Sequence, residues 1–175
     1  MKLLVADDDP VYQQLYLRLL GEEFEITVVG NGGEAWELLR QDPAFRLAIL
    51  NWQMPVMNGV EVCRLVRATL DLDGIYLLVA TANRDIDQVI EGFIAGADDY
   101  VIKPFYVQEL AARLRVGRRV TELQSALEKK ICELEQASRQ VKLLQGLLPI
   151  CSYCKRIRTE EQTWQEVEAY VSRHS

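Results

Sequence analysis

The sequence contains few of the residues that mark disulfide-rich, fibrous or membrane proteins. Its 175 residues include four cysteines, five prolines and one histidine, too little cysteine for a disulfide scaffold and too little proline for a collagen-like chain. No apolar run approaches the roughly 20 residues of a membrane-spanning helix, and negative charge appears already at Asp7, too early for a signal peptide. With 49% hydrophobic and 26% charged residues, the composition indicates a globular protein of the cytoplasm with no membrane contact.

Charge is distributed unevenly along the chain. Residues 1–110 hold 18 acidic and 8 basic side chains, a net charge of −10, whereas residues 111–175 hold 8 and 12, a net charge of +4. An acidic first part disfavours binding of nucleic acid there, and the positive excess of the second part is too dispersed to form a phosphate-binding stripe. We therefore expect no direct DNA binding and a change of organisation near residue 110.

Short apolar runs alternate with helical patterns over the first hundred residues. The predicted strands are 3–6, 26–29, 47–50, 75–79 and 100–102, and the predicted helices are 11–20, 33–40, 59–69, 86–95 and one from about 105. The apolar runs do not alternate in polarity, which is typical of parallel strands covered on both faces. The pattern predicts an α/β fold with a doubly wound, five-stranded parallel sheet, which binds ligands at the carboxyl ends of its strands.

Polar residues stand at the ends of four predicted strands. In chain order they are Asp7 and Asp8, Asn51, Thr81, and Lys103. Two adjacent carboxylates repel each other unless a cation neutralises them, and hard oxygen ligands suit Mg²⁺. A lysine and a hydroxyl facing that cation suit a phosphoryl group. The alternative, that the aspartates only cap the next helix, applies to the third one, Asp9.

Four sequence blocks carry these polar residues. They are Leu4 to Pro10, Asn51 to Gly59, Thr81-Ala82, and Lys103-Pro104-Phe105. Their order and spacing together resemble the response-regulator receiver domain of two-component signalling, over residues 1–118. The resemblance implies a flavodoxin-like receiver fold in which an aspartate at the end of the third strand takes a phosphoryl group from a histidine kinase with Mg²⁺ bound.

The resemblance also implies a role for each matching residue. The implied Mg²⁺ ligands are Asp7, Asp8 and the main-chain carbonyl of Gln53. Of the two aspartates, Asp8 is the one in direct contact with the metal. Thr81 and Lys103 are the implied catalytic contacts to the phosphoryl group, and Lys103 precedes the proline that the family usually holds in cis. Thr81 and Tyr100 are the implied switch residues, since a Thr81 side chain drawn towards phosphate leaves space for an aromatic ring.

The sequence departs from the family at the phosphoacceptor position, where it has Asn51. A carboxamide is a very poor nucleophile towards phosphorus and brings no negative charge to hold Mg²⁺. We therefore expect no acyl phosphate at this residue, weakened metal binding and a more stable metal-free fold. Two explanations stay open: a natural receiver that signals without phosphorylation, or a deliberate change that keeps an ordinary receiver unphosphorylated.

The chain after residue 108 favours one long helix. From Gln108 to Leu148 it has no proline and is rich in good helix formers. Over 113–148 we predict a coiled coil whose apolar seam, in heptad a and d positions, includes Val120, Leu123, Leu127, Leu134, Val141 and Leu144. Lys130 interrupts that seam. A solvent-exposed apolar stripe is stabilised when another surface covers it. The pattern therefore favours a parallel homodimer, with folding back of the helix onto the receiver as the alternative.

Residues 149–175 form a separate tail with a cysteine pair. Pro149 disfavours continuation of the helix, and Cys151 and Cys154 then stand three residues apart. Such a pair supplies two thiolates to Zn²⁺, but a structural site needs four ligands, and His174 adds at most a third. The segment resembles the start of a small cysteine-rich module, which implies a truncated chain. The alternatives are redox-active thiols and an unmetallated cap.

The resemblance implies a response regulator of a two-component phosphorelay. Its partner would be a sensor histidine kinase or phosphotransfer protein, and its output would be coiled-coil dimerisation. We expect no enzyme; the rival is a phosphatase or hydrolase that uses Asp7 as nucleophile, with Lys103 assisting. A third interpretation, favoured by Asn51, is a pseudo-receiver that serves only as a dimerisation scaffold.

Overall fold

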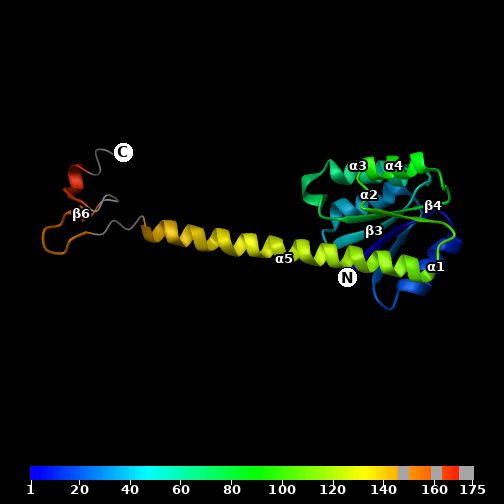
Figure 1. Ribbon diagram of the computed structural model, residues 1–175, viewed down its shortest axis with the longest axis horizontal. Coiled ribbons are helices and arrows are strands. Elements are labelled where there is room, and N and C mark those ends of the chain that lie inside the picture. Colours follow the sequence, from blue (N-terminus) through cyan, green and yellow to red (C-terminus); the bar gives the residue numbers. More distant parts are fainter. Residues whose placement is uncertain (146–149, 159–162, 170–175) are drawn as a thin grey trace. The chain divides into compact units, whose positions relative to one another are not determined.

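The computed structural model describes residues 1–145, 150–158 and 163–169 (Figure 1). The chain forms two compact units, Met1–Ala126 and Leu127–Ser175. The first unit contains an α/β sandwich, and the second contains the rest of the long helix and a small two-stranded sheet.

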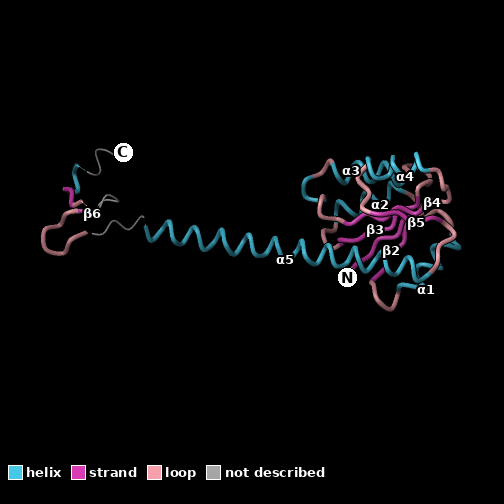
Figure 2. The backbone as a smooth tube through the Cα atoms, viewed as in Figure 1, coloured by secondary structure: helices cyan, strands magenta, loops and turns pink. Residues whose placement is uncertain are grey.

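The sheet of the first unit has five strands. They are β1 (Lys2–Ala6), β2 (Glu25–Val29), β3 (Phe45–Asn51), β4 (Tyr76–Thr81) and β5 (Asp99–Ile102). All neighbours pair in parallel in the order β2-β1-β3-β4-β5 (Figure 2). The chain reverses its direction of winding beside β1, so the doubly wound five-stranded parallel sheet predicted from the sequence is confirmed.

Side-chain caps set the starts of the first four α-helices. The helices are α1 (Pro10–Leu20), α2 (Gly32–Gln41), α3 (Gly59–Arg67), the 3-10 turn η1 (Leu70–Leu72), α4 (Ile86–Ile94) and α5 (Val107–Gln145). Asp9 accepts a hydrogen bond from the main-chain N–H of Val11, as expected for a cap before Pro10. Asn58 and Glu61 form a reciprocal capping box at α3. These caps fix the residues at which the helices begin.

Two apolar layers hold the helices on opposite faces of the sheet. Alternate residues of β1 enter different layers: Leu3 packs with α1 and the first turns of α5, whereas Leu4 packs with α2 and α3. Leu3, Leu4, Val5 and Ala6 have no exposed surface. Burial on both faces explains why the strands read as continuous apolar runs.

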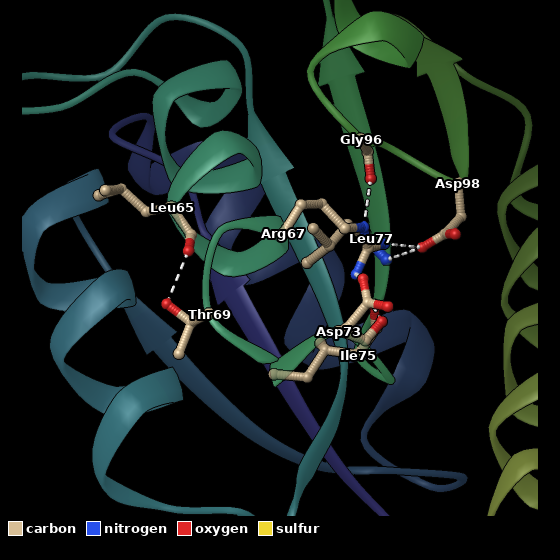
Figure 3. A network of polar contacts seen from close by, with 8 residues as sticks. All are labelled: Leu65, Arg67, Thr69, Asp73, Ile75, Leu77, Gly96 and Asp98. Carbon is tan, nitrogen blue, oxygen red and sulfur yellow. Dashed lines mark hydrogen bonds and ion pairs between the residues drawn. The ribbon is translucent and has the colours of Figure 1, made fainter. Parts of the chain in front are cut away.

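Arg67, at the end of α3, connects that helix to β4 and to the turn before β5 (Figure 3). Its guanidinium donates hydrogen bonds to the carbonyls of Gly96, Asp73 and Ile75 at 2.8–3.0 Å, and to the Asp98 carboxylate at 2.6 Å. Asp98 also accepts the main-chain N–H of Leu77 at 2.7 Å. One side chain thus satisfies three backbone carbonyls from two segments, at the edge opposite the polar strand ends.

The last helix starts close to its predicted position. α5 begins at Val107, near the predicted start at about residue 105, and the helix that covers the sheet is continuous with the segment over which a coiled coil is predicted. A Cβ at Gly117 would lie 2.6 Å from the ring of Tyr76 and 2.7 Å from Leu47, so only glycine permits this close approach of α5 to the sheet. None of the helices within residues 1–145 or 163–169 is long and apolar enough to cross a membrane.

The apolar seam of α5 is exposed where the structure describes it. Val120, Leu123, Leu127 and Leu134 are 36–68% exposed, and folding back of this stripe onto the receiver stays an alternative prediction. The side chains of Val141 and Leu144 lie outside the described residues. The seam also differs in detail, because Ile131, one position after Lys130, adds an apolar side chain that is 49% exposed. Whether the stripe forms a coiled coil stays a prediction.

The second unit has its own small sheet. β6 (Ile157–Arg158) pairs antiparallel with β7 (Trp164–Gln165), and Ile157 is fully buried. Cys151 and Cys154 lie in the turn before β6. The N–H of Cys154 donates to Sγ of Cys151 at 3.5 Å, and the N–H of Lys155 donates to the Cys151 carbonyl at 2.9 Å. This turn places the two sulfurs on one loop.

Candidate functional site

The carboxyl ends of β1, β3, β4 and β5 meet around one cavity of about 560 Å³. The predicted residues that line it are Asp8, Asn51, Gln53, Thr81 and Lys103. Asp7 lies beneath them and has no exposed surface. The sheet therefore brings together the acidic pair, the asparagine, the hydroxyl and the lysine that the sequence separates by up to 96 positions.

Lys103 is at the centre of the buried part of the site. Its Nζ donates to Oδ2 of Asp7 at 2.6 Å and to Oδ1 of Asn51 at 3.0 Å. The ammonium also lies 4.0 Å from the centre of the Tyr12 ring, within the range of a cation–π contact. The Lys103 side chain is only 7% exposed and that of Asp7 only 1%, so this charge pair is largely shielded from water.

Asn51 faces two different environments with the two ends of its amide. Oδ1 accepts from Lys103, whereas Nδ2 donates to Oδ1 of Asp8 at 2.8 Å and to the Gln53 carbonyl at 2.7 Å. Rotating the amide by half a turn would place Nδ2 against the ammonium and Oδ1 against two acceptors. The three partners therefore determine the orientation of the amide.

Burial raises the pKa of the Asp7 carboxyl above its ordinary value, while the hydrogen bond and charge of Lys103 oppose the shift. Further hydrogen bonds fix this residue: its Oδ1 accepts the N–H of Asp9 at 3.2 Å, and its main-chain carbonyl accepts Nε2 of Gln13 at 2.6 Å. Asp7 thus serves to position Lys103, whereas Asp8 is the exposed carboxylate of the pair.

The two switch residues lie on neighbouring strands. Thr81 is 3% exposed, and its Oγ1 accepts the N–H of Asn83 at 3.1 Å. Tyr100 is half-buried and packs edge-to-face on Phe93, with ring centres 5.7 Å apart. Both line a small void of about 10 Å³ between α4 and the sheet. The positions are those that the switch hypothesis requires, and the motion itself stays a prediction.

The loop after β3 is held close to the site. The N–H of Trp52 donates to the Ala80 carbonyl at 2.7 Å, and the N–H of Gly59 donates to the Trp52 carbonyl at 3.0 Å. A Cβ on Gly59 would lie 2.4 Å from the main-chain oxygen of Asn51, so glycine is required there. These contacts direct the Gln53 carbonyl towards Asn51. The peptide bond between Lys103 and Pro104 is cis, as the resemblance implies.

The donor set does not fit Mg²⁺ as it stands. The metal ligands implied by the resemblance include Asp8 and the Gln53 carbonyl, and both oxygens already accept hydrogens from Nδ2 of Asn51. A cation between them would meet the N–H side of the amide, which cannot act as a ligand.

Sequence reasoning missed several residues of the site. Tyr12 supplies the ring beneath Lys103, and Gln13 fixes the main chain at Asp7. Trp52, Asn83 and Gln88 complete the wall of the cavity. The signal for Tyr12 and Gln13 was their place in the first turn of the helix that follows Asp9, which faces the same edge of the sheet. Gln88, on α4, has no comparable local signal.

Cys151 and Cys154 supply two of the four ligands that a structural zinc site needs. Hydrogen bonds from the turn lower the pKa of Cys151, which favours the thiolate that a metal requires. Within residues 1–145, 150–158 and 163–169, no group of three or more potential ligands could hold a metal ion. His174 lies outside the described residues. Zinc binding at Cys151 and Cys154 therefore stays a prediction.

Comparison with known proteins identifies the family. Residues 3–115 match the response regulator receiver domain. The chain belongs to this family. It is 38% identical over 135 residues to the DNA-binding response regulator MtrA of Mycolicibacterium smegmatis, covering 77% of this chain and 58% of that protein. It is 36% identical over 129 residues to the response regulator MprA of Mycobacterium leprae, covering 73% and 55%.

Solved receiver structures have the same fold. The receiver domain of the Francisella response regulator 1452 superposes with a TM-score of 0.64 at 29% identity, covering 69% of this chain and 98% of that chain. The receiver domain of the sensor histidine kinase PA1611 from Pseudomonas aeruginosa, which has a magnesium ion in its active-site cleft, shares the fold at 24% identity and a TM-score of 0.61, covering 69% and 97%.

The family relationship corrects one expectation. The conclusion from charge that DNA binding is absent is wrong, because relatives that share this receiver are DNA-binding response regulators. The net charge of a receiver does not determine what the rest of its protein binds, so the acidic first part was not a valid argument. The chain spans only about half the length of these curated relatives.

Proposed function

We propose that this receiver domain of a two-component system signals without phosphorylation at residue 51, and that its output is pairing of α5 with a second copy of the chain. The observation that carries the first part is the amide of Asn51 at the phosphoacceptor position, with all three of its hydrogen bonds satisfied. The partner upstream would be a sensor histidine kinase or phosphotransfer protein in the cytoplasm that docks on the receiver without transferring its phosphoryl group.

The chemistry at residue 51 supports this proposal. Attack on phosphorus requires an electron pair on an oxygen that becomes the bridging atom, and the amide oxygen of Asn51 is weakly nucleophilic and already bonded to Lys103. Lys103 in turn is paired with Asp7. The receiver is therefore held in the arrangement of an unphosphorylated site.

The exposed stripe on α5 supports the output by pairing. Its apolar side chains recur at spacings of three and four residues, and the described ones are Val116, Val120, Leu123, Leu127, Ile131 and Leu134. Such a stripe on a soluble helix gains free energy when it is buried against an equivalent surface. Lys130, 71% exposed beside the stripe, weakens the middle and makes the pairing reversible.

The phosphorylation part is tested by intact mass after incubation with acetyl phosphate and Mg²⁺. The unchanged chain should gain no phosphoryl group, whereas the Asn51→Asp variant should gain one, because only the carboxylate supplies a competent oxygen. Phosphoryl uptake by the unchanged chain would refute this part. Lack of uptake by the variant would show that the remaining residues do not form a working site.

The pairing part is tested by sedimentation of the full chain. Leu127→Glu should convert a dimer into a monomer, because a carboxylate in the stripe opposes burial. Ser125→Glu is the matched control: Ser125 is also exposed on α5 but lies off the stripe, so this variant should remain a dimer. A monomeric unchanged chain, or equal effects of the two substitutions, would contradict the proposal.

DNA binding is a second candidate for the output. It is favoured by the relatives that are named DNA-binding response regulators. Fluorescence anisotropy of a labelled duplex with the full chain tests it: binding that weakens steeply with salt would support a phosphate-contacting surface on this chain. No change in anisotropy would place any such output outside these 175 residues.

A further inference from the structure

The Asn51 amide occupies a place where two oxygens converge. Oδ1 of Asp8 and the main-chain oxygen of Gln53 both point at Nδ2, at 2.8 and 2.7 Å. One oxygen carries charge and the other is a carbonyl dipole, and such a pair otherwise attracts a cation. Here the two partly positive N–H groups of the amide satisfy both oxygens.

The other end of the amide prevents it from turning to accept a metal. To offer Oδ1 to a cation between Asp8 and Gln53, the side chain must rotate and direct Nδ2 at the Lys103 ammonium. Two donors would then face each other in a site where Lys103 is 7% exposed, and the hydrogen bond of 3.0 Å from Lys103 would be lost. Metal binding through Asn51 and the contact with Lys103 therefore exclude each other.

We infer that the carboxamide of Asn51 is a built-in substitute for the divalent cation: it bridges Asp8, Gln53 and Lys103 and so makes the site insensitive to Mg²⁺. This inference deepens the proposed function, because it adds that Mg²⁺ no longer regulates the site. It rests on the proposed function only in treating the cavity as the phosphorylation site of the receiver. The effect of the amide differs from a simple loss of charge, because the amide competes with the cation for two ligands, the Asp8 carboxylate and the Gln53 carbonyl.

Two variants separate competition from loss of charge. Asn51→Asp removes the N–H groups and adds a ligand, since one carboxylate oxygen can contact Lys103 while the other contacts the cation. Asn51→Ala removes the N–H groups and adds nothing. If the amide competes, Asn51→Ala binds a divalent cation more tightly than the unchanged chain. If only the missing charge matters, Asn51→Ala binds it no better.

The experiment is titration of the full chains with Mn²⁺, with free ion measured by electron paramagnetic resonance and no phosphoryl donor present. We expect the tightest binding for Asn51→Asp, then Asn51→Ala, about tenfold tighter than the unchanged chain because two hydrogen bonds need not be broken. Asp8→Asn in the Asn51→Asp background should abolish the gain. Equal binding by the unchanged chain and Asn51→Ala would overturn the inference.

A second measurement does not depend on the alanine variant being folded. The side-chain amide signals of Asn51, assigned by their loss in Asn51→Asp, should not shift when Mg²⁺ is added to the ¹⁵N-labelled unchanged chain. A shift that saturates with Mg²⁺ would show a cation at the amide and overturn the inference. Failure of the proposed function would appear separately, as phosphoryl uptake or a monomeric chain, since neither measurement here involves either property.

Discussion

The hydroxyl of Tyr16 is a single buried polar group that we expect to lower the free energy of unfolding. Tyr16 has no exposed surface, its ring stacks on Phe105, and its hydroxyl is buried without a hydrogen-bond partner among the described residues. Tyr16→Phe should therefore raise the free energy of unfolding by about 1 kcal/mol, because a buried unpaired hydroxyl is removed and the ring packing is kept. Urea denaturation measures the change. A variant less stable than the unchanged chain would mean that the hydroxyl has a partner.

Cys63 gives a prediction for pH. Burial raises the pKa of this thiol to about 12, so between about pH 9 and 12 the unfolded chain loses a proton that the folded chain retains. Stability therefore falls as pH rises through this interval. Between pH 7 and pH 10 the unchanged chain should lose about 1 kcal/mol more of its free energy of unfolding than Cys63→Ala does. Urea denaturation at the two pH values measures these losses. Equal losses of the free energy of unfolding for the unchanged chain and Cys63→Ala would contradict the raised pKa of Cys63.

At the scale of elements, the local sequence predicted the five strands and the helices α1 to α5, because each has its own periodicity, but it missed the 3-10 turn η1. Asn58 followed by Glu61 is a start signal that acts within four residues. The contacts of Arg67 had no such signal. Its partners stand up to 31 positions away in the chain, and nothing in the sequence around residue 67 distinguishes it from Arg64.

Those two arginines of α3 provide a matched test. Arg67→Ala should lower the free energy of unfolding by about 2–4 kcal/mol, because three backbone carbonyls lose this donor and the Asp98 carboxylate loses its ion pair. Arg64→Ala should cost less than about 1 kcal/mol, since its pair with Glu91 is half exposed. Arg67→Lys should not restore stability, because one ammonium cannot reach the same acceptors. Equal losses in urea denaturation would contradict the role given to Arg67.

At the scale of the whole molecule, the sequence predicted which residues meet in the site but not how they are bonded. Strand order brings Asp7, Asn51 and Lys103 to one edge of the sheet, so their meeting follows from the fold. The direction of the Asn51 amide does not, because it depends on the Gln53 carbonyl and on the rotamer of Lys103. The sequence therefore predicted weakened metal binding from missing charge and could not predict competition by the amide.

The last residues of α5 that are buried in the core set the C-terminal boundary of the receiver domain. Leu110 and Leu114 are fully buried, and Thr121, beyond the predicted receiver boundary at residue 118, is only 2% exposed. A fragment of residues 1–126 should keep the melting temperature of the full receiver and be monomeric, since it retains these residues and lacks Leu127, Ile131 and Leu134 of the exposed stripe. Circular dichroism and sedimentation measure the two properties.

A fragment of residues 1–109 is the matched comparison. It retains all five strands but loses both buried leucines, and each buried leucine contributes about 2–5 kcal/mol, so the loss approaches the whole stability of a domain of this size. This fragment should show no cooperative melting transition. If it melts like residues 1–126, the sheet does not depend on α5. Movements at the switch face could then not be transmitted through the packing of Leu110 and Leu114, and the helix would be an appendage of the receiver, not part of it.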